Sequence, residues 1–267
     1  MKRVSGTLKI GLGLALVVAS LSACTVKEEP EYVERPVSSI YNSAMNFLQD
    51  DYYRDAAREF DEVERQHPYS VWATKAQLMA AYAYYQSNRY DDAIIALDRF
   101  TQLHPANREV SYAYYLKALC YYEQISDVAR DQKMTELALA SLSEVIKRFP
   151  ESQYARDAKV KIDLTHDHLA GKEMSIGRYY LAQKQYLAAI NRFKAVVEKY
   201  DTTTHVPEAL HRLTEAYLAL GITSEARKSA SVLGHNFPNS EWYEDSYFLF
   251  EGKPTTANVE KPWYKIW

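Results

Sequence analysis

The chain has 267 residues, of which 47% are hydrophobic and 25% are charged, values typical of a folded protein with a sizeable core. The formal net charge at pH 7 is −3, which argues against binding to nucleic acid, because no basic excess is available to neutralise phosphates. Only 8 residues are glycine, which argues against a turn-rich β architecture, whereas 23 are tyrosine, which indicates many half-buried faces.

The N-terminus predicts export and lipidation. Residues 1–9 carry three positive charges, and residues 10–21 are uncharged and mostly apolar but too short for a membrane-spanning helix, which needs roughly 20 residues. The segment ends in Leu21-Ser22-Ala23-Cys24, which resembles the bacterial lipobox. We therefore expect residues 1–23 to be a cleaved signal peptide and Cys24 to carry the lipid. An ordinary signal peptide followed by a chance cysteine is the alternative.

Residues 24–37 predict a lipidated, flexible tether, because they are charged, contain two prolines and show no periodicity. Two or three acyl chains on Cys24 would anchor the chain stably, since each buried methylene contributes about 0.8 kcal/mol. The residue after Cys24 is Thr25 and not the aspartate that marks retention in the inner membrane. By this resemblance, we expect a lipid anchor on the periplasmic face of the outer membrane in a Gram-negative bacterium.

From about residue 38 the apolar pattern is helical, and proline marks four helix ends, at His67-Pro68, His104-Pro105, Phe149-Pro150 and Phe237-Pro238. Their spacing, with small residues and aromatics at fixed positions between them, resembles the 34-residue tetratricopeptide repeat (TPR). We therefore predict an all-α fold, a right-handed superhelical solenoid of about five TPR helix hairpins. A helical domain without repeats is the alternative. The predicted solenoid covers residues 38–250, a tail covers 251–267, and the repeats cover about 37–70, 74–107, 108–152, 153–203 and 207–240.

Two insertions interrupt the repeat. The third repeat has extra residues around 126–135, and additional helical residues after Pro150 predict one long helix from about 152 to 183. Each insertion is either a partner site or a tolerated loop, and the sequence does not decide between them.

Tyrosines are concentrated in the first three repeats. In the TPR register, the concave positions of these repeats are tyrosines, which suit the binding of an extended peptide because a rigid ring loses little rotamer entropy. Packing between hairpins or onto the tether is the alternative. The predicted groove residues are Tyr41, Tyr82, Tyr85, Tyr112, Tyr115 and Tyr122.

The sequence contains no convincing catalytic or metal-binding motif. His166 and His168 are two residues apart on a predicted helix and point to different faces. The pairs Asp50-Asp51 and Asp91-Asp92 stand at turns, where they favour helix starts, and Cys120 lies in an apolar helical run, as a buried thiol does. We expect no catalytic residue, no metal and no cofactor, and hence not an enzyme.

The order of parts resembles the BamD family, also called ComL or YfiO, of outer-membrane lipoproteins: a lipobox, a short tether, five repeats with insertions, and a tail ending Lys261-Pro262-Trp263-Tyr264-Lys265-Ile266-Trp267. The resemblance implies a non-enzymatic scaffold of the β-barrel assembly (BAM) complex. The implied partners are the barrel protein BamA, through its POTRA domains, the lipoproteins BamC and BamE, and unfolded outer-membrane β-barrel proteins.

The resemblance also divides the roles along the chain. N-terminal repeats are expected to bind the aromatic-rich C-terminal signal of substrates, and C-terminal repeats to bind BamA, with Arg178, His211 and Glu215 as predicted partner residues. The alternatives are another periplasmic TPR lipoprotein, either a secretin pilotin or a peptidoglycan-associated scaffold, or a cell-wall hydrolase.

Overall fold

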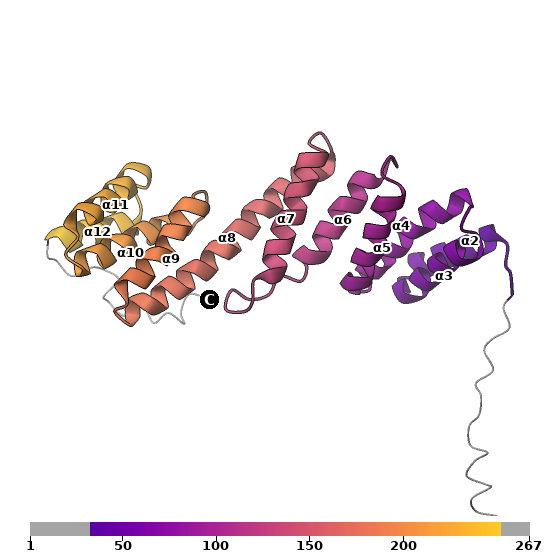
Figure 1. Cartoon of the computed structure of the whole chain (residues 1–267), viewed down its shortest axis with the longest axis horizontal. Helices are drawn as coiled ribbons and strands as arrows, with labels where there is room; N and C mark the ends of the chain where they lie inside the picture. Colours follow the sequence, from indigo (N-terminus) through magenta and orange to yellow (C-terminus); the bar gives the residue numbers. More distant parts are fainter. Residues whose placement is uncertain (1–32, 252–267) are drawn as a thin grey trace, which may run out of the picture. The chain divides into compact units, whose positions relative to one another are not determined.

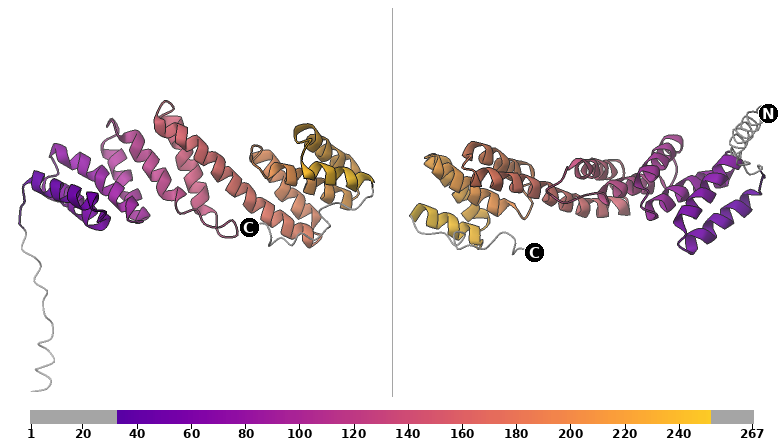
Figure 2. Two further views of the ribbon diagram at one scale, coloured as in Figure 1. Left: turned by 180° about the vertical axis from the view of Figure 1, so that it is seen from behind. Right: turned by 90° about the horizontal axis from the view of Figure 1, so that it is seen from below.

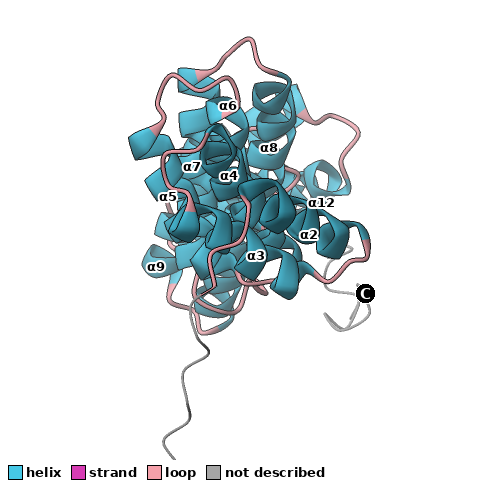
Figure 3. Ribbon diagram, turned by 90° about the vertical axis from the view of Figure 1, so that its right-hand side faces the viewer, coloured by secondary structure: helices cyan, strands magenta, loops and turns pink. Residues whose placement is uncertain are grey.

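A computed structural model describes residues 33–251, and every regular element in that range is an α-helix (Figures 1 and 3). Short loops join successive helices, except between α6 and α7. The predicted signal peptide, Cys24, most of the tether and the tail beyond Glu251 lie outside the described residues. The helices are α2 (Val37–Gln49), α3 (Tyr53–Gln66), α4 (Val71–Gln86), α5 (Tyr90–Leu103), α6 (Val110–Tyr122), α7 (Lys133–Arg148), α8 (Gln153–Ala182), α9 (Tyr186–Lys199), α10 (Val206–Ala219), α11 (Thr223–Asn236) and α12 (Glu241–Glu251).

The helices from α2 to α11 form five antiparallel hairpins, each packed against the next along the chain (Figures 1 and 2). Each helix packs mainly against the helices just before and just after it. One hairpin cannot bury its own apolar face, so stacking supplies the core. The prediction of an all-α TPR solenoid is confirmed.

Within four of the hairpins, the turn contains one residue with a left-handed backbone. These residues are Asp51, Asn88, Lys184 and Gly221, with φ between 58° and 73°. A two- or three-residue turn reverses the chain only if one residue adopts this conformation, which favours Gly, Asn and Asp. The third hairpin instead has the long loop between α6 and α7.

At the end of each of the five hairpins, the same turn leads to the next helix. The residue after each second helix accepts a backbone hydrogen bond from the N–H three residues later, at 3.0–3.1 Å. The accepting residues are His67, His104, Phe149, Tyr200 and Phe237. In three of these turns the donor is a serine that caps the next helix: the Oγ of Ser70, Ser152 and Ser240 accepts from the backbone N–H of Trp72, Ala155 and Trp242, respectively. The proline landmarks of the sequence mark these turns.

In three of the five hairpins, the core combines small residues of the first helix with a phenylalanine of the second. Phe60, Phe100 and Phe193 are fully buried in α3, α5 and α9. Alanines such as Ala81 let neighbouring helices approach, and at Gly177 the backbone of α8 comes so close to Phe193 that a Cβ atom would lie 2.4 Å from its ring. The small residues of one helix therefore leave the space that the aromatic ring of the next helix fills.

The insertion in the third repeat packs on the long helix. The Nζ of Lys172 in α8 donates hydrogen bonds to the carbonyl oxygens of Ala129 and Arg130, at 3.0 and 3.1 Å. The side chain of Val128 lies close to Gly171, where α8 has room for it. The predicted long helix is α8, with 30 residues, and the loop is fixed against it.

Beyond the fifth hairpin, α12 packs on α10 and α11 and covers the end of the core. Trp242 and Tyr243 of α12 contact the C-terminal cluster of buried residues. Cys120 is fully buried as predicted, and burial raises the pKa of its thiol to about 12, which keeps the thiol protonated.

Candidate functional site

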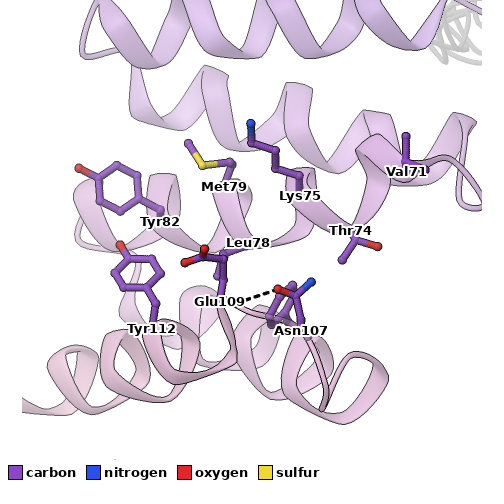
Figure 4. A pocket seen from close by; sticks show the side chains of 10 residues that line it. Val71, Thr74, Lys75, Leu78, Met79, Tyr82, Asn107, Glu109 and Tyr112 are labelled. Carbon is purple, nitrogen blue, oxygen red and sulfur yellow. Dashed lines mark hydrogen bonds between the residues drawn. The ribbon is translucent and has the colours of Figure 1, made fainter. Parts of the chain in front are cut away.

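A cavity of about 560 Å³ lies between α4 and α6 (Figure 4). Its floor is apolar, formed by Leu78, Met79 and the ring of Phe100. Its rim is polar, and Asn107 there accepts a hydrogen bond through Oδ1 from the backbone N–H of Glu109, at 2.9 Å. An apolar floor with a few polar groups around it is the usual composition of a ligand-binding cleft. The remaining lining residues are Val71, Thr74, Lys75, Tyr82 and Tyr112.

Two of the predicted groove tyrosines line this cavity together. Tyr82 of α4 and Tyr112 of α6 project side by side toward it, at the end away from Val71 (Figure 4). The hydroxyl of Tyr82 accepts a hydrogen bond from Nε2 of Gln86, at 2.5 Å. Burial raises the pKa of Tyr112, so its phenol stays neutral at physiological pH. The two rings therefore present half-buried, uncharged aromatic surface.

Tyr154 of α8 packs against two tyrosines of α6. The ring of Tyr115 stacks on Tyr154 at a centroid distance of 5.2 Å, and Tyr112 lies 5.5 Å from the same ring. The Tyr115 hydroxyl donates a hydrogen bond to Asp157, and the Nζ of Lys161 lies 3.2 Å from that carboxylate. The hydrogen bond from Tyr115 lowers the pKa of Asp157, so the carboxylate stays charged.

The two outer tyrosines of the row are held at its edges. The Tyr85 ring lies 5.8 Å from Tyr90, its hydroxyl is 3.4 Å from Glu123, and burial raises its pKa to about 12. Tyr122 lies beneath Lys161, whose Nζ is 5.3 Å from the ring centroid. Five tyrosines of α4 and α6 therefore form one half-buried surface, against which Tyr154 of α8 packs. We call these five the tyrosine row: Tyr82, Tyr85, Tyr112, Tyr115 and Tyr122.

Tyr41 does not belong to the tyrosine row. Only 4% of its surface is exposed, and its ring packs between Phe60, at 5.5 Å, and Trp72, at 4.8 Å. The prediction that Tyr41 faces a groove is wrong, because Trp72 of the next hairpin covers the position. The repeat register alone does not show which neighbour contributes a large side chain at that point.

The predicted partner residues of the C-terminal repeats separate into surface and core. Arg178 of α8 is exposed and pairs with Glu208 of α10 at 3.3 Å, and Arg212 pairs with Glu215 at 2.9 Å. Arg212 also lies 3.5 Å from Glu208 and over the ring of Trp242, at 5.3 Å. Ion pairs therefore connect α8 and α10 on one surface, and the contact of Arg212 with the Trp242 ring joins this surface to α12.

His211 is not on that surface. It is 2% exposed, and its Nδ1 lies 2.9 Å from Oγ of Ser246 in α12, with the Trp242 ring 5.4 Å away. Burial, followed by the nearby Arg212, lowers its pKa to about 4, so the imidazole is neutral. The prediction of His211 as a partner residue is wrong, because α12, which no repeat landmark predicted, covers it.

Within residues 33–251, no group of three or more His, Cys, Asp or Glu side chains is arranged to hold a metal ion. Within the same range, no helix combines the length and hydropathy needed to cross a bilayer.

Comparison with known proteins decides the family. The sequence model of the YfiO family, described as "Outer membrane lipoprotein", matches residues 33–233. Outer membrane protein assembly factor BamD of Caulobacter vibrioides is 48% identical over 254 residues, which are 94% of this chain and 83% of that protein. BamD of Rickettsia prowazekii is 46% identical, over 93% of this chain and 96% of that protein. The chain belongs to the BamD family. This assignment favours a role in outer-membrane assembly over a pilotin or a peptidoglycan-associated scaffold.

A more distant BamD sequence also matches over the full length of this chain. BamD of Neisseria meningitidis serogroup A is 32% identical over the whole of both chains. Among solved structures, the TPR domain of P58(IPK) has a TM-score of 0.42 and 14% identity, over 93% of this chain and 61% of that one.

Proposed function

We propose that this BamD-family chain is a non-enzymatic scaffold of the β-barrel assembly complex, held by a lipid on Cys24 at the periplasmic face of the outer membrane. It binds unfolded barrel proteins through its N-terminal repeats and the POTRA domains of BamA through its C-terminal repeats. The observation that carries the proposal is the tyrosine row beside an apolar cavity, in a chain whose relatives are named assembly factors.

The tyrosine row suits an extended, aromatic-rich peptide. Rings of the peptide can stack on exposed parts of Tyr82 and Tyr112, and a side chain can enter the apolar cavity floored by Leu78 and Met79. Burial raises the pKa of Tyr112 and Tyr115, so these two phenols stay neutral and act as hydrogen-bond donors and acceptors without demanding a charged ligand. Recognition of this kind tolerates many sequences, as a general assembly factor requires.

The charged surface of α8 and α10 suits a folded partner. Arg178 and Glu215 are on that surface, and their ion pairs are partly exposed, so a partner can exchange them for intermolecular pairs. We assign BamA to this surface. BamC and BamE, whose occurrence follows from family resemblance alone, are proposed as further partners without an assigned surface.

The first test measures peptide binding. A fluorescent ten-residue peptide from the C-terminus of a β-barrel protein should bind the chain. The double variant Tyr82→Ser/Tyr112→Ser should lose about thirtyfold in affinity, because each of the two removed rings contributes on the order of 1 kcal/mol. Tyr179→Ser/Tyr247→Ser is the matched control, since these two tyrosines are 64% and 52% exposed and lie outside the row. Equal affinities for both double variants would contradict the substrate assignment.

The second test identifies the partner. An affinity pull-down from detergent-solubilised membranes should recover a large β-barrel protein with POTRA domains. Reversal of charge at two surface positions, Arg178→Glu and Glu215→Lys, should reduce that recovery. Recovery of only a secretin or of peptidoglycan would overturn the proposal.

A further inference from the structure

The turn between α3 and α4 exposes large apolar side chains. Tyr69 is fully exposed, Val71 is 87% exposed and Trp72 is 38% exposed. We call these three residues the apolar turn. At the end of α5, Leu103 is 59% exposed, and residues of the following turn line the same cavity as Val71. Large apolar side chains are thus exposed where each of the first two hairpins ends.

The turn itself does not require these side chains. The same backbone hydrogen bond occurs in the turn that follows each of the five hairpins, so the residues of these turns can be aligned. The position of Tyr69 is occupied in the other four by Ala106, Glu151, Thr202 and Asn239, and that of Val71 by Arg108, Gln153, Thr204 and Glu241. Every other turn is therefore polar or small at both exposed positions. Tyr69 and Val71 therefore call for a function outside the fold, whereas Trp72 also packs on the Tyr41 ring, at 4.8 Å.

The apolar turn lies at the end of the first hairpin where the chain enters it. Trp72 contacts the ring of Tyr41 at 4.8 Å, one helical turn after α2 begins at Val37. Val37 follows Cys24 by 13 positions, and a chain of that length spans at most about 45 Å when fully extended. A lipid on Cys24 would hold this end of the hairpin within that distance of the bilayer.

The composition of the turn favours the bilayer over a protein partner. Tyrosine and tryptophan are the residues enriched where protein meets the lipid headgroups, because each combines an apolar ring with one polar group. Lys75, Arg108 and Glu109 nearby carry both signs of charge, so attraction to anionic lipid is not the basis of the contact. An exposed apolar tip close to a lipid anchor supplies the second contact that one anchor point lacks.

We propose that the apolar turn inserts among the lipid headgroups of the membrane that carries the anchor. This inference rests on the lipid anchor of the proposed function and adds an orientation to it. Val71 belongs both to the apolar turn and to the lining of the cavity between α4 and α6, so the cavity opens beside the bilayer. A substrate segment bound there is held next to the membrane into which it must insert.

The test compares two ends of the same hairpin in the full-length, lipidated chain. An environment-sensitive fluorophore is attached through Tyr69→Cys or, in the control, through Asp50→Cys, which is exposed in the turn between α2 and α3 at the opposite end. Both variants carry Cys120→Ala, so that only the new thiol reacts. The proteins are reconstituted into phosphatidylethanolamine and phosphatidylglycerol vesicles with nitroxide-labelled lipid, and flotation measures anchoring.

Insertion predicts quenching at position 69 about threefold stronger than at position 50, little changed by salt, and reduced by Val71→Ser in the Tyr69→Cys background. A chain that floats but is quenched equally at both positions would reject membrane contact by the turn while leaving the anchor intact. A chain that does not float would reject the anchor and this inference with it. Equal quenching together with cross-linking of position 69 to a protein would reassign the turn to a protein partner.

Discussion

Helices α8 and α9 pack closely because residue 177 is glycine, which has no Cβ atom to collide with the neighbouring helix. A methyl group there would lie 2.4–2.9 Å from three carbons of the buried Phe193 ring. We expect Gly177→Ala to destabilise the protein by about 1–3 kcal/mol, because overpacking outweighs the gain in helix propensity. Urea unfolding followed by circular dichroism measures the change. Gly171→Ala in the same helix is the control, since its new methyl meets only the end of the His205 side chain and Val128, and it should be close to neutral.

His211 makes the stability of the C-terminal hairpin depend on pH. Its pKa is about 4 in the folded chain and about 6.5 when unfolded, so between these values the unfolded state binds the extra proton. Stability is therefore lost as the pH falls from 6.5 towards 4, by up to about 3 kcal/mol from this group. His211→Asn should reduce the difference between the unfolding free energies measured at pH 7 and at pH 4.5. A variant with an unchanged pH profile would contradict this account.

Single residues also show where sequence reasoning stops. Repeat register placed Tyr82 and Tyr112 on the first helices of successive hairpins, and the structure brings them to one cavity. It failed at Tyr41 and His211, because each is covered by a residue from outside its own hairpin, Trp72 in one case and α12 in the other. A register describes the average repeat, whereas burial depends on the particular neighbour.

At the scale of elements, the hairpin turns differ in how well their residues suit them. Lys184 adopts φ of 58° in the turn between α8 and α9, a conformation that strains a residue with a Cβ atom, whereas Gly221 occupies the matching position between α10 and α11. Lys184→Gly should stabilise the protein by about 0.5–1 kcal/mol, and Gly221→Ala should destabilise it by about 1 kcal/mol. In thermal unfolding, Lys184→Gly should raise the Tm and Gly221→Ala should lower it. Shifts of the same sign would contradict the argument from backbone strain.

The order of helices could be predicted because proline and the small residues impose local constraints. His67-Pro68 and its equivalents end helices whatever the tertiary structure, and the aromatic and alanine spacing then defines hairpins. Two features of the fold could not be predicted in this way. The docking of the loop on Lys172 joins segments 42 and 43 residues apart, and α12 follows the last landmark proline without a repeat of its own. Both depend on contacts that no local pattern encodes.

At the scale of the molecule, contacts run mainly from each helix to its neighbours in the chain. A solenoid of this kind transmits instability to adjacent repeats and weakly beyond them. Phe100 and Phe193 are equivalent buried rings in the second and fourth hairpins, and replacing either by alanine removes about 3–5 kcal/mol of local stability.

Hydrogen exchange should therefore distinguish the two variants. Phe100→Ala should accelerate exchange in α4–α6, the helices that carry the cavity, and weaken peptide binding while leaving α10 and α11 protected. Phe193→Ala should accelerate exchange in α8–α11, leave α2–α4 protected and spare peptide binding. The pair has the same chemistry and the same burial, so each serves as the control for the other. Uniform acceleration along the chain in both variants would show that the five hairpins unfold as one cooperative unit, and would contradict the division of substrate and partner binding between the two ends of the solenoid.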